Sequence, residues 1–380
     1  MRIALALLAL TIGAATQARP PDGWRDVTTF FRDGVKREGI QGASLAWIKD
    51  GRIDAIEMTG FADAASKTPV ARETIYHWAS ITKTFTAVAI MQLRDQGKLT
   101  LDDSIVDYVP ELSYVHNPYG KMRDITIRHL LSHSAGFRGG TWPWGGDKAW
   151  HPFEPPSWAQ VAAMMPYTEI LFPPGSRYSY SNPGVIFLGR VIERLSGEPF
   201  ESYVDKQILR PLGMRDTFFD RAPAFARSRR SHSYYVNDGT LTEAPFDFDT
   251  GITVSNGGLN APLDDMAKWI GFLTGSRPEY DAILKRSSLE EMFTKVVPVS
   301  AGGPGEQGVG EGAMGLSFFL EKHGGLDLIA HSGSQNGFIL HFYINPATRS
   351  AYIVAFNTET PATRAFDAAL RDEIVKRIWK

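Results

Sequence analysis

Apolar residues recur at helical spacing near both ends of the chain and through its middle. Four of them follow this spacing near the N-terminus: Val27, Phe30, Phe31 and Val35. Because residues three and four apart share one face of an α-helix, they predict a helix over residues 24–38. The sequence predicts further helices over residues 80–96, 126–132, 183–195, 263–273, 288–296 and 361–380.

Short apolar runs near both ends predict strands. Residues 43–48 and 53–58 are two such runs, and the residues between them include Asp50-Gly51, a pair typical of tight hairpins. Four more runs lie toward the C-terminus, over residues 315–320, 326–331, 338–344 and 351–356. Neither group makes a full sheet alone, so we expect the two groups to pair with each other.

The pattern therefore predicts an α+β fold with an α/β sandwich-like arrangement. One antiparallel sheet would come from both chain ends, flanked by the terminal helices, with a mostly helical insert. The sheet-containing part would comprise residues 19–75 and 300–380, the mainly helical part residues 76–299, and a functional site would lie between them. Two stretches rich in glycine or proline, residues 142–156 and 301–315, are predicted to be irregular loops, the second of them mobile.

The composition is that of an ordinary globular protein and excludes several classes. The chain has 380 residues, is 43% hydrophobic and 22% charged, and its 40 basic and 42 acidic residues give a net charge of -2. No nucleic-acid partner is expected, because such proteins usually carry a basic excess. Cysteine is absent, which excludes a catalytic thiol, a disulfide framework and a thiolate metal site. Neither a metal nor another cofactor is expected.

The first 18 residues have the pattern of a signal peptide. Arg2 supplies a positive start, residues 3–12 form an apolar run, and Thr16-Gln17-Ala18 has small residues typical of a cleavage site. The apolar run is too short for a comfortable permanent span of a bilayer. We therefore expect cleavage after Ala18 and a periplasmic or secreted protein without a stable membrane anchor.

A serine and a lysine stand three residues apart in Ser80-Ile81-Thr82-Lys83. On a helix the two side chains share one face, so the amine and the hydroxyl can meet. A serine hydroxyl is a weak nucleophile until a base takes its proton. Lysine can be that base when burial or a nearby cation lowers its pKa, and apolar Trp78 and Phe85 flank the pair. Taken alone, a helix cap beside a solvated lysine would explain the motif better.

Two further motifs carry polar groups that suit acyl transfer. Tyr180-Ser181-Asn182 follows a Pro-Pro-Gly turn, and there a phenol can relay a proton and an amide can orient a substrate carbonyl. His331-Ser332-Gly333-Ser334 ends a predicted strand, and its small residues would let a substrate backbone lie alongside. A backbone N–H of that segment could form an oxyanion hole with the N–H of Ser80. Purely structural roles would account for either motif alone.

The order of the three motifs resembles the serine β-lactamase and penicillin-binding protein superfamily. Its members carry Ser-x-x-Lys, then Tyr-x-Asn or Ser-x-Asn, then a strand with Lys or His, Thr or Ser, and Gly. The resemblance covers most of the chain after residue 18 and includes the segments at residues 128–137 and 173–175. It implies that Ser80 is the acylated nucleophile and that Lys83 is the general base or tunes it.

The resemblance also implies roles for the other two motifs. Tyr180 would relay a proton, and Asn182 would bind a substrate amide. The substrate-docking strand would comprise His331, Ser332, Gly333 and Ser334. Ser334 would supply a backbone N–H to the oxyanion.

Two details narrow the resemblance within the superfamily. The Tyr-x-Asn form is similar to class C β-lactamases, certain D-alanyl-D-alanine carboxypeptidases and related esterases. The third motif opens with His331 instead of lysine, which is more similar to the carboxypeptidase and peptidase branch. The chain also lacks the Glu-x-x-Leu-Asn of class A enzymes, so the sequence does not support a deacylating water activated by glutamate.

Other residues indicate weaker alternatives. His129 and His133 stand four apart, as in zinc-binding helices, but no glutamate lies between them, so packing or capping explains them better. Ser134 lies in a segment close to a nucleophile elbow that lacks its first glycine, which leaves an α/β-hydrolase as a third hypothesis. Three tryptophans fit a substrate cleft and a small loop core equally well: Trp142, Trp144 and Trp150.

The sequence thus predicts an exported serine hydrolase that acts through a covalent acyl-enzyme on an amide or ester. The substrate would be a D-alanyl peptide, a β-lactam or a small ester, so the expected partner is a small molecule or a peptide. The second hypothesis is a non-catalytic or slowly acylated sensor that recognises penicillins.

Overall fold

An antiparallel sheet drawn from both ends of the chain organises the structure. This computed structural model describes residues 19–140, 157–300 and 312–380. In chain order the strands of the sheet are β1 Gly42–Lys49, β2 Arg52–Asp63, β3 Thr68–Pro69, β9 Val297–Val299, β10 Gly312–Met314, β11 Phe319–His323, β12 Leu326–Gln335, β13 Phe338–Asn345 and β14 Ser350–Phe356. Within the described ranges these nine strands lie in the order β3-β2-β1-β14-β13-β12-β11-β10-β9. The predicted α+β fold, with one sheet built from both chain ends, is confirmed.

The two chain ends meet where β1 pairs with β14. Ala43 lies opposite Phe356 in this antiparallel pair, in the interior of the sheet. The turn from β1 to β2 contains Asp50 and Gly51, with φ values of 47° and 72°. Two successive positive φ values match a type I′ turn, which explains the hairpin predicted from the Asp-Gly pair.

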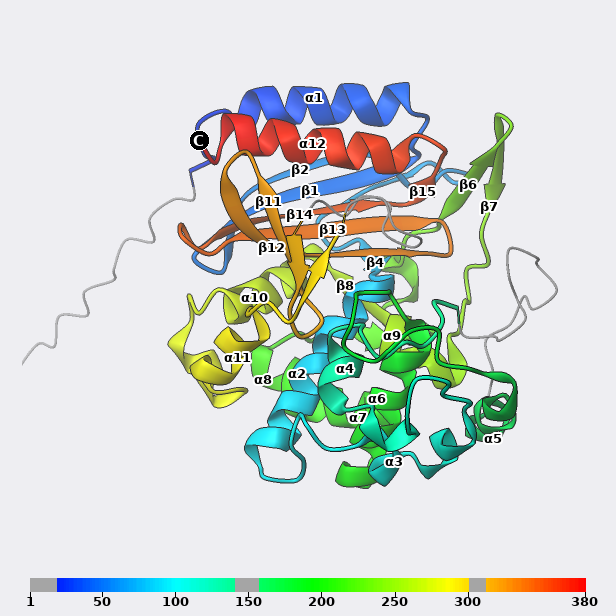
Figure 1. Cartoon of the computed structure of the whole chain (residues 1–380). Coiled ribbons are helices and arrows are strands. Elements are labelled where there is room, and N and C mark those ends of the chain that lie inside the picture. Colours follow the sequence, from blue (N-terminus) through cyan, green and yellow to red (C-terminus); the bar gives the residue numbers. More distant parts are fainter. Residues whose placement is uncertain (1–18, 141–156, 301–311) are drawn as a thin grey trace, which may run out of the picture.

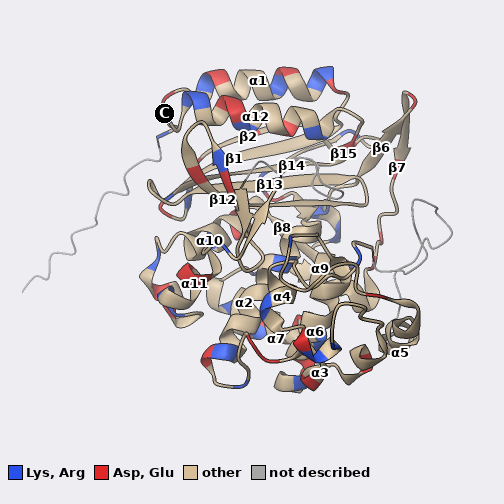
Figure 2. Cartoon of the chain, in the orientation of Figure 1, with Lys and Arg blue, Asp and Glu red and all other residues tan. Residues whose placement is uncertain are grey.

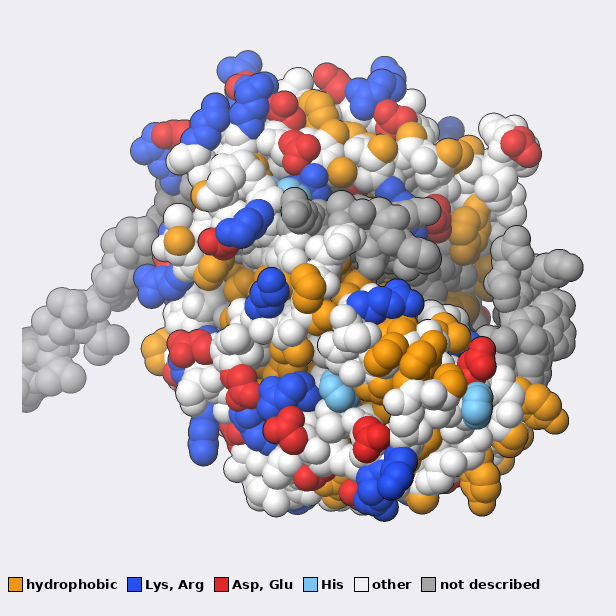
Figure 3. Space-filling view, viewed as in Figure 1, with side chains coloured by type: hydrophobic (Ala, Val, Ile, Leu, Met, Phe, Trp, Pro, Cys, Tyr) orange, Lys and Arg blue, Asp and Glu red, His pale blue; other side chains and the backbone are white. Residues whose placement is uncertain are grey.

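The terminal helices α1 (Trp24–Arg37) and α12 (Thr363–Arg377) lie side by side on one face of the sheet (Figure 1). Phe31 and Phe366 are among the buried side chains that they contribute to the core beneath them. Gly34 permits the close approach, because a Cβ at this position would lie 2.0 Å from the Phe366 ring. Charged residues occur along both helices (Figure 2), and basic and acidic side chains are interspersed at this end of the molecule (Figure 3).

A helical body covers the other face of the sheet (Figure 1). Its helices are α2 Thr82–Asp95, α3 Ile105–Tyr108, α4 Ile127–Leu131, α5 Trp158–Ala163, α6 Asn182–Ser196, α7 Phe200–Val204, α8 Arg210–Leu212, α9 Val254–Gly257, α10 Leu263–Leu273 and α11 Arg286–Met292. Every residue of α2 from Thr82 to Leu93 is buried. Phe85 of α2 stacks on Trp269 of α10, with 3.7 Å between the ring centroids. This packing fixes the N-terminal end of α2, which carries the first motif.

Two small sheets link the layers. One contains β4 Ile75–His77, β5 Phe218–Phe219 and β8 Leu259–Pro262, and the other contains β6 Tyr234–Asn237, β7 Thr240–Glu243 and β15 Thr358–Glu359. In the first, β4 and β5 both pair with β8. The chain passes from β4 directly into the turn before α2. The pairing of β4 with β8 therefore helps to position that turn.

Two predicted helices have different bounds in the structure. The helix predicted over residues 80–96 begins at Thr82, because residues Ala79–Ile81 form a 3-10 turn, η1, before it. The helix predicted over residues 288–296 is α11, which ends at Met292 because the chain then enters β9.

Two predicted strands are also displaced or extended. The strand predicted over residues 315–320 is β11, which starts only at Phe319. Ser317 has a positive φ of 64° and its N–H binds the carbonyl of Leu131, so the chain turns before the strand begins. The strand predicted over residues 326–331 is β12, which continues to Gln335 because its polar end still pairs with β13.

Part of the predicted glycine-rich loop is in fact a strand, since β10 occupies residues 312–314. The rest of that stretch, the tryptophan-rich stretch over residues 142–156 and the predicted signal peptide over residues 1–18 lie outside the described residues, apart from residue 315. In the ranges that the structure does describe, no helix has the length and apolar character needed to cross a membrane.

Candidate active site

Ser80 lies on the tight turn η1 at the N-terminal end of α2. Ala79, just before it, has a positive φ of 47°, which is uncommon for a residue with a Cβ. Trp78 anchors the turn, because its backbone N–H binds the Leu259 carbonyl at 2.7 Å and its indole N–H binds the Ala261 carbonyl at 2.8 Å. Strained backbone persists only where such bonds fix it, and it is common at functional sites.

Lys83 extends from the first turn of α2 toward Ser80. Its Nζ donates a hydrogen bond to Ser80 Oγ at 3.0 Å and a second to the backbone carbonyl of Asn256 at 2.9 Å. The lysine side chain is 0% exposed. A buried amine is costly unless it is hydrogen-bonded, so the Asn256 carbonyl of α9 stabilises it beside the serine. The Ser80–Lys83 distance lies within the reach of direct proton transfer.

Tyr180 completes a three-residue cluster with Ser80 and Lys83. Its side chain is hydrogen-bonded to that of Ser80, and the centre of its ring lies 5.0 Å from Lys83 Nζ. Burial raises the pKa of Tyr180 above its ordinary value, with the Ser80 hydrogen bond opposing. The phenol is therefore neutral at physiological pH and can donate a proton.

Asn182 is the first residue of α6, next to this cluster in the chain. Its backbone N–H binds the Gly139 carbonyl at 3.0 Å. Ser181 caps the helix by accepting from the Gly184 N–H at 3.2 Å. The Asn182 Oδ1 atom is buried and has no hydrogen-bond partner among the residues that the structure describes. A buried carbonyl oxygen without such a partner can accept a hydrogen bond from a substrate amide.

The third motif forms the end of β12, beside the Ser80 turn. β11 pairs with β12 only as far as Ala330, whereas β13 pairs with it to the end, so the last residues of β12 are paired on one side. A Cβ at Gly333 would lie 2.4 Å from the Trp78 carbonyl oxygen. Glycine at this position therefore allows β12 to approach the turn that carries Ser80.

His331 is buried at the start of this motif, with 1% of its surface exposed. Its Nδ1 donates to the Ser332 carbonyl at 2.7 Å. Burial and the nearby Lys83 lower the pKa of His331 to about 3. The ring is therefore neutral at physiological pH, and the first position of the motif adds no positive charge beside Lys83.

Arg364 is a polar neighbour of the third motif that the sequence did not reveal. Its Nη2 donates to Ser334 Oγ at 2.6 Å and lies 3.4 Å from Glu359 Oε1. Arg364 belongs to α12, which packs against the sheet far from the motif in sequence. An arginine on a terminal helix gives no sequence signal of such a contact.

The residues that indicated weaker alternatives in the sequence, His129 and Ser134, make structural contacts. His129 takes part in a capping box, in which its Nδ1 accepts from the Thr126 N–H at 3.2 Å. Ser134 is buried, its hydroxyl lies 2.9 Å from that of Ser132, and the main sheet is antiparallel, which speaks against the α/β-hydrolase hypothesis. Among the described residues, no cluster of His, Asp or Glu could hold a metal ion.

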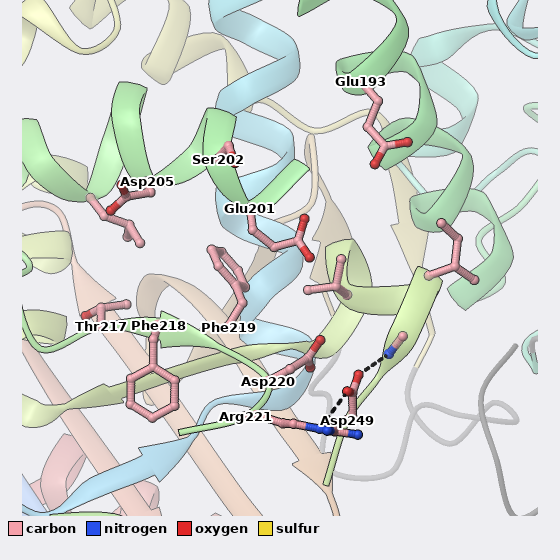
Figure 4. A pocket seen from close by; sticks show the side chains of 14 residues that line it. Glu193, Glu201, Ser202, Asp205, Thr217, Phe218, Phe219, Asp220, Arg221 and Asp249 are labelled. Atoms are coloured by element: carbon pink, nitrogen blue, oxygen red, sulfur yellow. Dashed lines mark hydrogen bonds and ion pairs between the residues drawn. The ribbon is translucent and has the colours of Figure 1, made fainter. Parts of the chain in front are cut away.

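A cavity of about 710 Å³ lies apart from the three motifs, none of whose residues line it. Five carboxylates line it: Glu193, Glu201, Asp205, Asp220 and Asp249. Figure 4 shows Glu201 and Asp220 projecting toward one another across it, with Arg221 paired to Asp249 at 3.1 Å. Burial raises the pKa of Asp220 to about 6, with further contributions from Asp249 and Glu201.

The raised pKa of Asp220 predicts that Asp220→Asn stabilises the protein at pH 8. The folded state binds the Asp220 proton more tightly than the unfolded chain, whose pKa is 3.8, so ionisation weakens folding as the pH rises through about 6. A neutral amide removes a penalty of up to about 3 kcal/mol, and its oxygen can still accept from Thr250. Thermal unfolding at pH 8 should show a higher Tm for the variant, and the gain should vanish near pH 4.

Asp216→Asn is a control of opposite sign for this prediction. A hydrogen bond from Arg229 lowers the pKa of Asp216, so its neutralisation should lower the Tm at pH 8. An Asp220→Asn variant that is no more stable at pH 8, or equally stabilised at both pH values, would contradict the predicted cost of ionising the buried Asp220 carboxyl.

The fold, in which the three motifs lie close together, is that of the class of serine β-lactamases and penicillin-binding proteins. The chain belongs to the Beta-lactamase family, whose model matches residues 27–376. Acyl-enzyme hydrolysis of amides or esters is the chemistry of this superfamily.

The chain is similar to several proteins of this fold that are described as different kinds of protein. Protein flp of Staphylococcus aureus (strain MW2) is 23% identical over 354 residues, which are 93% of this chain and 67% of flp. The octameric penicillin-binding protein homologue from Pyrococcus abyssi is 28% identical with a TM-score of 0.77, over 93% of this chain and 79% of that one. The D-amino acid amidase from Ochrobactrum anthropi SV3 is 21% identical with a TM-score of 0.77, over 93% and 97%, which shows the shared fold.

Proposed function

We propose that the protein is an exported serine hydrolase in which Ser80 forms a covalent acyl-enzyme with an amide or ester substrate. The observation that carries this proposal is the hydrogen bond of 3.0 Å between the buried Lys83 Nζ and Ser80 Oγ, with the Tyr180 side chain bonded to the same serine. A serine hydroxyl between an amine and a phenol has both a proton acceptor and a proton donor within reach.

The proposed reaction has two halves. In the first, the Ser80 proton passes to the Lys83–Tyr180 pair while Oγ bonds to the substrate carbonyl carbon, and the backbone N–H groups of Ser80 and Ser334 stabilise the oxyanion. The tetrahedral intermediate then expels an amine or alcohol, which takes a proton through Tyr180. In the second half, water attacks the acyl carbon, Oγ leaves and regains its proton, and the acid product departs. The protons of Lys83 and Tyr180 are coupled, so their apparent pKa values belong to the pair.

The substrate side of the proposal rests on two groups around the cluster. The Oδ1 atom of Asn182, which has no hydrogen-bond partner in the described ranges, suits a substrate amide N–H, and the side of β12 beyond its pairing with β11 suits an extended backbone. Arg364 lies beside Ser334 and suits a carboxylate at the end of the bound substrate. D-alanyl peptides and β-lactams carry an amide and a carboxylate in this relation, whereas a small neutral ester needs neither group.

Arg364→Ala is expected to separate these substrate classes. Loss of the guanidinium should raise KM about 10-fold for a substrate with a terminal carboxylate, because a hydrogen bond to a charged group contributes about 1.5–3 kcal/mol. KM for a neutral ester should change little. Initial-rate kinetics with one substrate of each kind measure the difference, and Arg364→Lys, which keeps the charge, should lie between. An equal change with both substrates would contradict carboxylate recognition.

A substrate panel tests the proposed function itself. Wild type and Ser80→Ala are assayed with a phenyl ester, a chromogenic cephalosporin and a D-alanyl-D-alanine peptide, and intact masses are recorded after a fluorophosphonate or penicillin. Turnover by wild type alone supports the hydrolase. A stable adduct without turnover would instead support a slowly acylated sensor, and neither label nor turnover would refute both. The proposed export predicts, in a cell that secretes the protein, a mature chain that begins at Arg19.

A further inference from the structure

His133 accepts two hydrogen bonds from the segment that carries Tyr180. Its backbone carbonyl accepts from the Ser179 N–H at 2.8 Å, and its Nδ1 accepts from the Ser181 N–H at 3.1 Å. The imidazole also stacks on the Tyr180 ring, with 4.5 Å between centroids and 28° between planes. The residues on both sides of the tyrosine, and the tyrosine ring itself, are therefore held by one histidine.

The backbone of His133 has a strained conformation at this position. Its φ is +53°, in the left-handed region that residues with a Cβ rarely adopt. The side chain is 1% exposed. A buried histidine in a strained conformation needs strong local contacts to hold it there, and the contacts of His133 include those to residues 179–181.

The contact to Ser181 fixes which nitrogen of the ring carries the proton. A backbone N–H can only donate, so Nδ1 must offer its lone pair, and the proton of the neutral ring is on Nε2. A second proton on Nδ1 would place two donors against each other and break the contact. Burial, Lys83 and His331 all lower the pKa of His133 well below its ordinary value. The ring is therefore neutral at physiological pH.

The surroundings of the ring leave it no acid partner among the described residues. The titratable groups that face it are Lys83 from α2, His331 from β12, and Tyr178 and Tyr180 from the segment before α6. Lysine favours a neutral neighbour, His331 is itself neutral, and burial raises the pKa of Tyr180, so its phenol is protonated at neutral pH. Every neighbour is thus compatible with a neutral ring, and none would hold an imidazolium.

We propose that His133, fixed as the neutral Nε2–H tautomer, is a positioning residue that holds the Tyr180 hydroxyl on Ser80. This inference rests on the proposed function of Ser80 and Tyr180 in acyl transfer. His133 does not touch the reacting atoms. It acts through Tyr180: the stack sets the plane of the phenol, and the bond to Ser181 sets the position of the backbone that carries it.

Two substitutions separate the stack from the hydrogen bond. His133→Phe keeps a ring against Tyr180 but removes the Nδ1 acceptor, whereas His133→Asn keeps a polar acceptor and tolerates the left-handed backbone but removes the ring. Each should lower the acylation rate and kcat about 100-fold, because a displacement of about 1 Å at a reacting group can cost that much. KM should change less than kcat. His129→Asn is the matched control, because it makes the same change in a capping histidine four residues away.

The pH profile distinguishes positioning from a general loss of stability. In both His133 variants the alkaline limb of kcat/KM should shift, because it reports the coupled Lys83–Tyr180 pair and the phenol is no longer held. A variant that is only less stable would lose activity equally at every pH, and His129→Asn should keep the wild-type profile. Wild-type acylation rates and an unshifted profile in folded His133→Asn would overturn the proposal.

A measurement that does not depend on enzymatic turnover tests this inference independently of the proposed function. Ring ¹⁵N resonances of His133, recorded in wild type and in Ser80→Ala, should show a protonated Nε2 and an unprotonated Nδ1 from pH 8 to pH 5. A protonated Nδ1 anywhere in that range would overturn the proposal even if the variants do not fold. If the tautomer is as expected but wild type neither hydrolyses nor is labelled, the proposed function fails while the fixed position of Tyr180 stands.

Discussion

Replacing Ser80 with alanine is expected to abolish covalent labelling and to lower turnover at least about 10⁴-fold. Alanine removes the oxygen that would bond to the acyl carbon, and neither Lys83 nor Tyr180 can replace it at the same place. The oxyanion N–H groups stay, so substrate binding should survive better than chemistry. Intact-mass analysis after a fluorophosphonate probe and a hydrolysis time course measure the two effects on one sample.

The control for this prediction is Ser134→Ala. Ser134 is buried and hydrogen-bonded to Ser132, so this variant should retain both label and turnover. Both proteins should unfold near the wild-type temperature, which excludes collapse of the fold as the cause of lost activity. A label that persists in Ser80→Ala, or that maps to Ser134, would end the case for Ser80.

Lys83→Met is expected to lower the rate of acylation about 10³-fold, as is typical when a general base is removed. Methionine fills most of the volume of the buried lysine stem, but it cannot accept the Ser80 proton or donate to Ser80 and to Asn256. The Asn256 carbonyl loses a partner at a cost of about 1–3 kcal/mol, partly offset because a buried amine is removed. The rate of probe labelling over pH 6–10 measures the first effect, and thermal unfolding measures the second.

Lys98→Met, just beyond the other end of α2, is the matched control. Lys98 is exposed, and its Nζ donates a long hydrogen bond of 3.4 Å to the Leu195 carbonyl, so labelling should match wild type. Slow acylation that also appears in Lys98→Met would point to α2 as a whole and not to the amine. Acylation of Lys83→Met at the wild-type rate would show that Tyr180 alone can take the serine proton.

The fold could be predicted from sequence where patterns are long and local. Asp50-Gly51 predicts the β1–β2 hairpin because few residues other than glycine, asparagine and aspartate adopt two positive φ values in succession. The pairing of the two chain ends follows from the incomplete strand sets at each end. Strands of two to four residues such as β4 and β5 escape prediction, because so short a segment has no periodicity to detect.

The candidate site could be predicted only in part for a similar reason. The proximity of Ser80 and Lys83 follows from local helical geometry, and the importance of the other motifs from their order along the chain. The contacts to Asn256, Arg364 and His133 come from elements far apart in sequence. Spacing along the chain carries no information on such contacts, and His133 was interpreted as a packing or capping residue because the strand and segment facing it were unknown.

The pairing of β1 with β14 has a consequence for biosynthesis. β1 leaves the ribosome long before β14, its partner, so this strand pair cannot form until the chain has grown through β14. Pairings between such distant segments also form slowly once both are present. A nascent chain that ends before β12 already contains Ser80 and Lys83, yet it lacks the strand that lies against Trp78 and the serine turn. A growing polypeptide of that length therefore carries the proposed Ser80–Lys83 pair without the proposed docking strand, and the proposed site can be completed only after β12 has been synthesised.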